Sequence, residues 1–489
     1  MTTTTTTTEV RRSTRSGAIG LVGAAVNGAF GFVLTTVIVR TFGAEGSGAL
    51  FTVIGVIAIL GAVCCLGADT ALMWAIPRRE RAEAGRLLPV ALAPTVALAV
   101  LLAVAGVLAA GPISRALLDD ADGVALVRLA FAGVPVIVAA TVLLAAVRAT
   151  RSVTAYVGVQ FLFVPIARPV LMIAAVAAGG GLLLGFAGWL VPMGVALLLA
   201  LALVAGPLGW RRPARADWRP FWSFALPRAA SVAIDASSMW VGVLLTGALA
   251  GQAEAGVFAA VGRYVMAGLL IMQGLRVAIA PQLSRLLGDG RRAEAAQVYR
   301  RTTLWIVLLS WPAYLVLAVF APGFLQLFGS QFAGGALPMA VLALAMLVNV
   351  GVGLVQTVLL MSGNSRGHLL ATAAGLLLNV VAGVVLIRSL GALGAAVAWS
   401  LGIICENVLA AAFARRALGE RLAGRALWRA GPAVVAVTLA ASLIGVLAGG
   451  RGLPGLAVTV AVFVLGGLAA LGSGRVRTRL RNVRGEVAS

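Results

Sequence analysis

The sequence contains no lysine and a single histidine, His368. Without lysine there is no Walker A motif, because the lysine of that motif must reach the nucleotide phosphates, and no Schiff-base lysine chemistry. One histidine cannot form the zinc motif that needs two histidines on one helix. These absences exclude nucleotide-driven transport through a P-loop and several classes of enzyme, and we expect no cofactor and no metal.

Cysteine and charged residues are also scarce. The three cysteines, Cys64, Cys65 and Cys405, all lie in apolar runs, so they are interpreted as small buried thiols rather than as disulfides or metal ligands. Only 11% of the residues are charged and 61% are hydrophobic, whereas a soluble domain is about 25% charged and about 45–50% apolar. The composition predicts an all-α polytopic membrane protein.

Long apolar runs recur from Gly17 to Gly472. A run of about 20 residues crosses ~30 Å of hydrocarbon at about 1.5 Å per residue. We expect about fourteen transmembrane helices, at residues 17–39, 47–76, 87–111, 124–146, 153–178, 181–206, 222–250, 254–280, 303–323, 333–361, 367–389, 391–413, 430–449 and 453–473.

These spans predict an organisation in two pseudo-symmetric six-helix lobes with two extra C-terminal helices. The predicted segments are a disordered tail at 1–16, lobes at 17–206 and 222–413, a basic connector at 207–221, a loop at 414–429, the extra helices at 430–473 and a basic tail at 474–489. The longest loop on the far side from the termini, "GPISRALLDDADG", is short. Membrane polymerases and ligases of sugar chains generally present a sizeable loop there, so an enzyme is not expected.

The net charge of +22 comes from arginine alone, since all 38 basic residues are arginine. In the fourteen-span model, 29 of them lie in the segments on the side of the N-terminus, five lie on the other side or at the span ends next to it, and four lie deeper within spans. Cytoplasmic loops carry such an excess of positive charge, which places both termini in the cytoplasm. The asymmetry explains the net charge without nucleic acid, and anionic lipid head groups are expected partners.

One stretch of the sequence is repeated after 208 positions. "TFGAEGSGALFTV" from Thr41 aligns with "LAGQAEAGVFAAV" from Leu249, which places Gly43 on Gly251 and Gly48 on Gly256. Each stretch joins the first span of a lobe to the second, and both first spans run in the same direction. The pattern predicts a parallel repeat, with two lobes related by an axis along the membrane normal.

The first stretch and its surroundings resemble the opening of polysaccharide-export and oligosaccharide flippases, in the superfamily that also contains multidrug-and-toxin exporters and lipid II flippases. The matching positions are Arg40, Gly43, Gly48, Leu66–Gly67 and Arg78–Arg79, with Phe42 where the family usually has leucine. Spans 11 and 12 also resemble the family through Asn379 and the turn "GALGAA", although Arg388 stands where a proline is usual. The resemblance covers essentially the whole chain and implies a lipid-linked glycan as cargo.

Ionisable groups within the spans are the candidate transport residues, because each costs about 2.5–3.5 kcal/mol at a helix centre unless it faces a cavity or a partner. Arg168 lies between Pro165 and Pro169 in span 5, where proline frees backbone carbonyls. Arg263 lies seven residues beyond Gly256 in span 8. Both are predicted to bind substrate. The alternatives are an ion pair for Arg168 and snorkelling to the surface for Arg263.

Span 7 contains a second set of candidates, Arg228 and Asp235, which lie on one helix face. Arg228 is predicted to bind substrate, with snorkelling to the inner surface as the alternative. Asp235 either pairs with an arginine or holds a coupling cation, and Asn27 is its counterpart after the shift of 208 residues.

Three further features are less specific. Arg276 is a weaker candidate for substrate binding, because it is close to the end of span 8. Glu406 in span 12 is expected in a buried pair or an ion-coupling site. Tryptophans near span ends, among them Trp189, are interpreted as an interfacial belt with no role in cargo binding.

Arginine binds phosphate through two parallel hydrogen bonds and stays charged at any depth, so a cavity with arginines suits an anionic cargo. We expect a flippase for a polyprenyl-diphosphate oligosaccharide or cell-wall precursor, working by alternating access in the bacterial plasma membrane. Expected partners are the glycan lipid, membrane lipids and a polysaccharide polymerase or glycosyltransferases, and we expect a monomer. The alternatives are a gradient-driven exporter of cationic drugs and a non-transporting scaffold for cell-envelope enzymes.

Overall fold

The computed structural model describes residues 3–118, 123–150, 153–206, 208–422 and 424–472, and these residues form helices without any strand. The helices are α1 (Thr3–Cys64), α2 (Ala68–Ala75), η1 (Ile76–Arg78), α3 (Arg81–Ala84), α4 (Leu87–Leu108), α5 (Ala110–Leu117), α6 (Val124–Thr150), α7 (Val153–Val157), η2 (Gly158–Phe163), α8 (Val164–Ala177), α9 (Leu182–Ala205), α10 (Arg215–Ala250), α11 (Gln252–Ala267), α12 (Leu270–Gly288), α13 (Arg292–Val319), α14 (Ala321–Gln326), η3 (Ser330–Gly335), α15 (Ala336–Gly351), α16 (Val355–Met361), α17 (Ser365–Leu418), α18 (Arg425–Gly449) and α19 (Leu453–Gly472). The predicted all-α class is confirmed.

Nine helices of the described residues are long and apolar enough to cross a membrane, and the number rises to eleven when each of two bent pairs counts as one span. The helices α1 and α17 are too long for one crossing. Each bends where a glycine leaves the helical conformation, Gly43 in α1 and Gly391 in α17. With two crossings in each of these helices, the structure is compatible with the fourteen predicted spans.

Two predicted boundaries differ from the structure. The helix α1 begins at Thr3, so it includes most of the tail that was predicted to be disordered, where neither proline nor glycine interrupts the chain before Gly17. The helix α10 begins at Arg215, within the predicted connector. There Asp217 accepts a hydrogen bond from the Ala214 backbone N–H, which caps the helix start. The tail at 474–489 lies outside the described residues.

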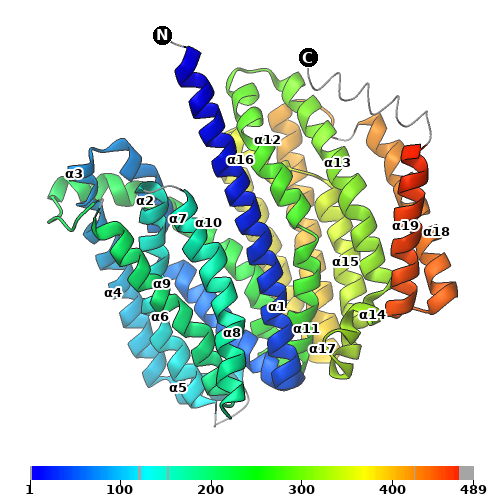
Figure 1. Cartoon of the computed structure of the whole chain (residues 1–489), viewed down its shortest axis with the longest axis horizontal. Helices are drawn as coiled ribbons and strands as arrows, with labels where there is room; N and C mark the ends of the chain where they lie inside the picture. The colour runs from blue at the N-terminus through cyan, green and yellow to red at the C-terminus, as the bar shows by residue number, and fades with distance from the viewer. Residues whose placement is uncertain (1–2, 119–122, 151–152, 207, 423, 473–489) are drawn as a thin grey trace.

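The helices form two groups, with α2–α9 on the left of Figure 1, α11–α19 on the right and α1 along the boundary between them. The start of α1 and the end of α19 lie at the same end of the bundle, at the top of this view. We call this end the terminal face and the opposite end the distal face. We call α1–α9 the first lobe and α10–α17 the second lobe.

The predicted repeat is visible in the backbone at the distal face. Gly43 and Gly251 both adopt positive φ, 66° and 90°, with extended ψ values. A Cβ on Gly48 would overlap the Gln252 carbonyl, and a Cβ on Gly256 would overlap the Ala44 carbonyl. Because Ala44 and Gln252 are themselves related by the shift of 208 residues, the two stretches pack on each other symmetrically and join the lobes.

The close approach at Gly48 yields a stability prediction. Gly48→Ala should lower the free energy of unfolding by about 3 kcal/mol, because the atom in the way belongs to a backbone that must move. Gly194→Ala in α9 is the matched control, since nothing lies within 4 Å of its Cβ position and alanine favours a helix. Unfolding of both variants in detergent tests this, and equal stability of the two would contradict the packing described.

At the terminal face, the first half of α10 packs against the first lobe although the helix belongs to the second. A Cβ on Gly67 would overlap the Ala225 carbonyl, and the ring of Trp74 stacks on Phe224 with centroids 4.5 Å apart. The helix axis bends by 48° between Arg215–Ser238 and Trp240–Ala250. This helix therefore spans the boundary between the lobes.

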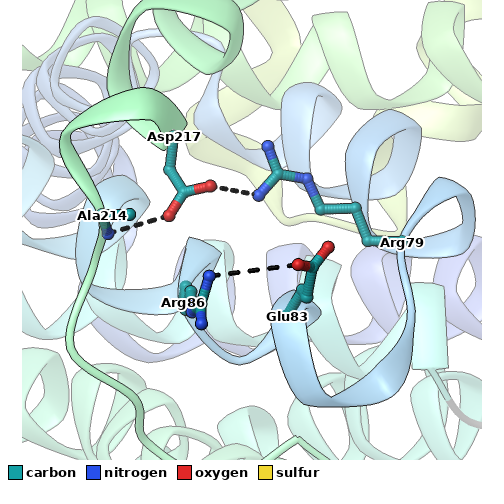
Figure 2. A network of polar contacts seen from close by, with 5 residues as sticks. All are labelled: Arg79, Glu83, Arg86, Ala214 and Asp217. Carbon is teal, nitrogen blue, oxygen red and sulfur yellow. Dashed lines mark hydrogen bonds and ion pairs between the residues drawn. The ribbon is translucent and has the colours of Figure 1, made fainter.

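An ion pair fixes the start of α10 to the first lobe (Figure 2). Arg79 follows η1, and its guanidinium donates to the carboxylate of Asp217, whose side chain is only 7% exposed. The other carboxylate oxygen caps α10 through Ala214, so both oxygens of Asp217 are used. In the same loop Arg86 lies 4.0 Å from Glu83. The loop between α2 and α4 therefore holds the connector that links the two lobes.

The pair of Arg79 and Asp217 makes stability depend on pH. Burial raises the pKa of the Asp217 carboxyl, but the hydrogen bond and charge of Arg79 and the Ala214 N–H outweigh burial, so the pKa lies below its usual value. A lowered pKa gives stability that is complete above the unfolded value of about 3.9 and is lost as the pH falls through the folded value. Asp217→Asn should cost about 1–3 kcal/mol at pH 7 and progressively less as the pH falls below about 4. Unfolding of both proteins between pH 3 and 7 tests this, and a constant difference would show that the contact does not need the ionised carboxylate.

Candidate substrate cavity

A cavity of about 490 Å³ lies between the lobes. Its walls come from α1, α6, η2, α8 and α9 of the first lobe and from α10, α11 and the start of α12 of the second. Most of the lining is apolar, and among the side chains that the structure describes the charged ones in the lining are Arg168 and Arg263. The volume is within the range of about 300–1,000 Å³ typical of small-molecule sites, which usually combine apolar walls with a few polar groups.

Arg168 lies on α8 in the wall of the first lobe. Its Nε donates to the Trp189 carbonyl at 3.3 Å, and its guanidinium carbon lies 4.0 Å from the centre of the Trp189 ring. Trp189 is 6% exposed and stacks on Phe186, so the tryptophan is itself held in place. The guanidinium is therefore fixed against one wall of the cavity.

The local sequence explains why α8 is irregular here. Pro165 has no N–H to donate, and the residues before it form a π-helical turn at Gly158–Phe163, which closes with a hydrogen bond from Val164 to the Val159 carbonyl. A π turn inserts one residue into the helix and changes the direction of the side chains on its two sides. Gln160 within the turn and Arg168 beyond it both line the cavity.

Arg263 lies on α11 in the opposite wall, which belongs to the second lobe. Its Nη1 lies about 4.0 Å from the Cβ position of Gly31 in α1, so the side chain reaches the first lobe. Arg168 and Arg263 line the same cavity, so their like charges repel each other across it. Each lobe thus contributes one arginine to the same cavity.

Neither arginine has an acidic partner among the residues that the structure describes, where the ion pairs found are those of Arg79, Arg86, Arg291 and Arg300. The predicted alternative of an ion pair for Arg168 is therefore not found in this part of the chain. Two like charges in a mostly apolar cavity are costly unless an anion binds between them. The positive charge of the cavity therefore favours the binding of an anionic group.

Hydrogen bonds between the lobes close the distal face. The buried Gln252 of α11 connects to Thr52 Oγ1 at 3.0 Å and donates to the Leu117 carbonyl. Near the rim, Arg40 donates to the Leu327 carbonyl at 2.9 Å, and the Ala44 N–H donates to Gln331 at 2.9 Å. These contacts join the lobes at the distal face.

The structure does not bring Arg228 and Arg276 into the cavity, although both were predicted to bind substrate. Both side chains are exposed and neither lines the cavity. Arg228 lies in the half of α10 before the bend, and Arg276 lies beyond the 44° bend between α11 and α12. Arg263 lies before the second of these bends and lines the cavity, whereas Arg228 and Arg276 do not.

The structure places only one of the two counterparts Asn27 and Asp235 relative to the cavity. Asn27 lines the cavity, on α1. The backbone of Asp235 lies within α10, but its side chain lies outside the described residues. Its predicted roles in ion coupling or in pairing with an arginine stay predictions.

Glu406 lies outside the cavity, in a polar cluster within the second lobe. Its Oε1 accepts hydrogen bonds from Gln356 Nε2 at 2.6 Å and from Thr372 Oγ1 at 3.3 Å. Thr372 also lies 3.1 Å from His368 Nδ1. Glu406 therefore joins α16 to both halves of α17, and its predicted role in ion coupling stays a prediction.

Two cavity residues were not recognised in the sequence. Trp189 was interpreted as part of an interfacial belt, and this was wrong, because it is buried against Arg168. The contact between Trp189 and Arg168 could have been predicted from the turn at 179–181. The two residues lie at similar numbers of positions before and after this turn, which places them at similar depths on adjacent helices. Nothing in the sequence indicated that Gln160 would line the cavity, because the spacing of apolar residues does not reveal a π turn.

The fold and the cavity define a polytopic helical protein with two lobes around a central cavity. Residues 227–385 match the MatE family. The chain superposes on the lipid II flippase MurJ in an inward closed conformation with a TM-score of 0.70 and 11% identity, covering 92% of this chain and 99% of MurJ. An inward-facing multidrug resistance MATE family transporter of the MOP superfamily gives a TM-score of 0.67 and 17% identity, covering 79% of this chain and 94% of that one.

A curated relative is the probable low-salt glycan biosynthesis flippase Agl15 of Haloferax volcanii, which is 26% identical over 178 residues. The match covers 35% of this chain and only 36% of the relative, so it spans about a third of that protein. Together with the MatE match and the superpositions, it confirms the resemblance to the MATE-like exporter superfamily that the sequence indicated. The chain has the fold of these transporters.

Proposed function

We propose that the protein is a flippase that moves a lipid-linked glycan, carried on a polyprenyl diphosphate, across the bacterial plasma membrane. The observation that carries this proposal is the pair of Arg168 and Arg263, one from each lobe, in a cavity of apolar walls without an acidic partner among the described residues. A diphosphate offers several oxygens to two guanidiniums. The lipid tail of such a cargo can stay in the bilayer, and the relationship to Agl15 and MurJ supports a glycan lipid.

The position of the two arginines supports a mechanism of alternating access. Without cargo, the like charges of Arg168 and Arg263 repel each other across the cavity that the two lobes share. A bound diphosphate neutralises both charges and favours closer approach of the lobes around it. A ligand shifts a conformational equilibrium only through its different affinity for the two states, and this neutralisation provides such a difference.

Two other functions fit less well. An exporter of organic cations, which the MATE relatives also suggest, would favour acidic residues in the cavity, whereas the charged lining among the described side chains is arginine. A non-transporting scaffold needs no charged central cavity. The family consists of transporters, which favours transport over catalysis.

The orientation in the membrane follows from the arginine distribution. We infer that the terminal face is cytoplasmic, because 29 of the 38 arginines belong to the segments on that side. The cavity, closed at the distal face, would then receive its cargo from the cytoplasmic leaflet. A glycosyltransferase on the cytoplasmic side and a polymerase on the other are the partners that such a cargo implies.

The membrane potential is a sufficient source of energy in this proposal. A negative charge that moves from the cytoplasm to the outside gains about 2.3 kcal/mol per 100 mV. That energy corresponds to about a fifty-fold change in distribution for each charge moved. Asp235 is a candidate for additional coupling to a proton or cation, on the grounds of its place in span 7 alone.

Thiol labelling tests the orientation. In a variant without native cysteines, an impermeant reagent added to intact cells should label Ser330→Cys and Ser389→Cys, which are exposed near the distal face. Ser365→Cys, exposed at the start of α17, should react only after the membrane is permeabilised. The reverse pattern would contradict the proposed orientation.

Ligand-dependent stability tests the class of cargo. Farnesyl diphosphate at about 100 times its dissociation constant should stabilise the purified protein by about 2.7 kcal/mol, because it binds the folded state alone. Farnesol lacks the charge and rhodamine carries the opposite one, so neither should stabilise it comparably. Stabilisation by rhodamine and not by the diphosphate would favour the cation exporter.

A further inference from the structure

We propose that Trp189 is a positioning residue that sets the orientation in which Arg168 meets an anionic cargo. This inference rests on the proposed function, since it concerns how the cavity binds phosphate. Trp189 is not itself the phosphate ligand. It acts through two contacts with Arg168, one from its ring and one from its backbone carbonyl.

The two contacts restrain the guanidinium in different ways. The ring of Trp189 lies 4.0 Å below the guanidinium carbon, which fixes the plane of the group and offsets part of the cost of an unpaired charge in apolar surroundings. The Trp189 carbonyl accepts from Nε at 3.3 Å, which fixes the rotation within that plane. Only the two terminal nitrogens then remain to donate to a cargo, as an end-on fork.

The fold holds Trp189 firmly beneath Arg168. A Cβ at Gly188 would lie 2.9 Å from the Leu171 carbonyl, so only glycine allows α9 to approach α8 this closely. On its own helix, Trp189 stacks on the buried Phe186 with centroids 5.6 Å apart and an interplanar angle of 11°. A ring supported in this way can hold a long arginine side chain in one conformation.

This arrangement has a consequence for specificity. A flexible arginine loses conformational entropy when it binds, whereas a preorganised one has already lost it. Lysine could not replace Arg168, because a point charge has neither a plane to stack nor a fork to present. The fixed fork matches a pair of phosphate oxygens, and a diphosphate offers such oxygens on both of its phosphates.

Binding of farnesyl diphosphate to the purified full chain, measured by calorimetry, tests the proposal. Trp189→Leu removes the ring and should weaken binding about tenfold. Trp189→Phe keeps a smaller ring over the guanidinium and should weaken it about threefold. In an Arg168→Gln background the same two changes should alter binding less than twofold, because the residue through which Trp189 acts is gone. Trp305→Leu, at an exposed tryptophan of α13, is the matched control.

The outcomes separate this inference from the proposed function. Equal weakening by Trp189→Leu with and without Arg168 would show an independent or merely structural role and overturn the inference. If Arg168→Gln weakens binding while Trp189→Leu does not, the inference fails and the proposed function stands. If Arg168→Gln leaves binding unchanged, both fail. If Trp189→Leu does not fold, the double-mutant cycle of Trp189→Phe with Arg168→Gln tests the inference in its place.

Discussion

Arg263→Gln is expected to lower the flipping rate about a hundredfold with little change in the amount of folded protein, and Arg168→Gln is expected to do the same. Each change removes one charge-assisted pair of hydrogen bonds with the cargo, worth about 1.5–3 kcal/mol. Glutamine is shorter than arginine but keeps a polar, hydrogen-bonding end, so the change removes the charge without placing an apolar group at the site. Stability should not fall, because each variant loses a charge that has no acidic partner among the described residues and lies in a mostly apolar cavity.

Initial rates of flipping in proteoliposomes measure this effect. Arg276→Gln is the matched control, because it removes the same charge from an exposed position outside the cavity and should change the rate at most threefold. Comparable losses in all three variants would mean that overall positive charge, rather than the cavity, determines transport. Normal rates in both cavity variants would overturn the role of phosphate binding.

Gln252→Leu is expected to open the distal face. The side chain of Gln252 is 7% exposed, and it connects to Thr52 and to the Leu117 carbonyl across the boundary between the lobes. Leucine would leave these groups without a partner while the face is closed, at a cost of about 1–3 kcal/mol for each buried group. Water can satisfy them once the lobes separate, so the equilibrium should shift towards an outward-open state by about ten- to a hundredfold.

A reporter cysteine measures this shift. In a variant without native cysteines, Thr141→Cys places a thiol in the cavity lining. An impermeant reagent added on the distal side should label it at least ten times faster after Gln252→Leu. Gln331→Leu removes an exposed hydrogen bond at the rim and should have a much smaller effect. Equal labelling in both variants would show that Gln252 does not hold the distal face closed.

The sequence predicts the features that depend on composition and local pattern. Apolar runs predicted the all-α class, and the two stretches of the predicted repeat form turns of similar backbone conformation at Gly43 and Gly251. Arg168 and Arg263 were found because a charge within an apolar run is rare and costly. Their meeting in one cavity was a hypothesis until the structure placed them on opposite walls.

The features that the sequence did not predict depend on bends and on contacts between distant residues. Arg228 and Arg276 lie in the predicted spans 7 and 8, but each is separated by a helix bend from all or most of the residues of its span that line the cavity. Arg79 and Asp217 are separated by 138 positions, and nothing in either local pattern indicates the other. Trp189 was assigned to the interfacial belt because tryptophans near span ends usually lie there. That tendency gives no information about the contact of Trp189 with Arg168 on the neighbouring helix α8.

Flipping of a fluorescent polyprenyl-diphosphate oligosaccharide in proteoliposomes tests the central claim most directly, with the membrane potential and the pH gradient set independently. Wild-type protein should flip this lipid well above protein-free vesicles, faster when the receiving side is positive, and Arg168→Gln combined with Arg263→Gln should abolish the activity. Flipping no faster than in protein-free vesicles, or at the same rate in the double variant, would contradict the proposal that the two arginines carry an anionic glycan lipid between the lobes.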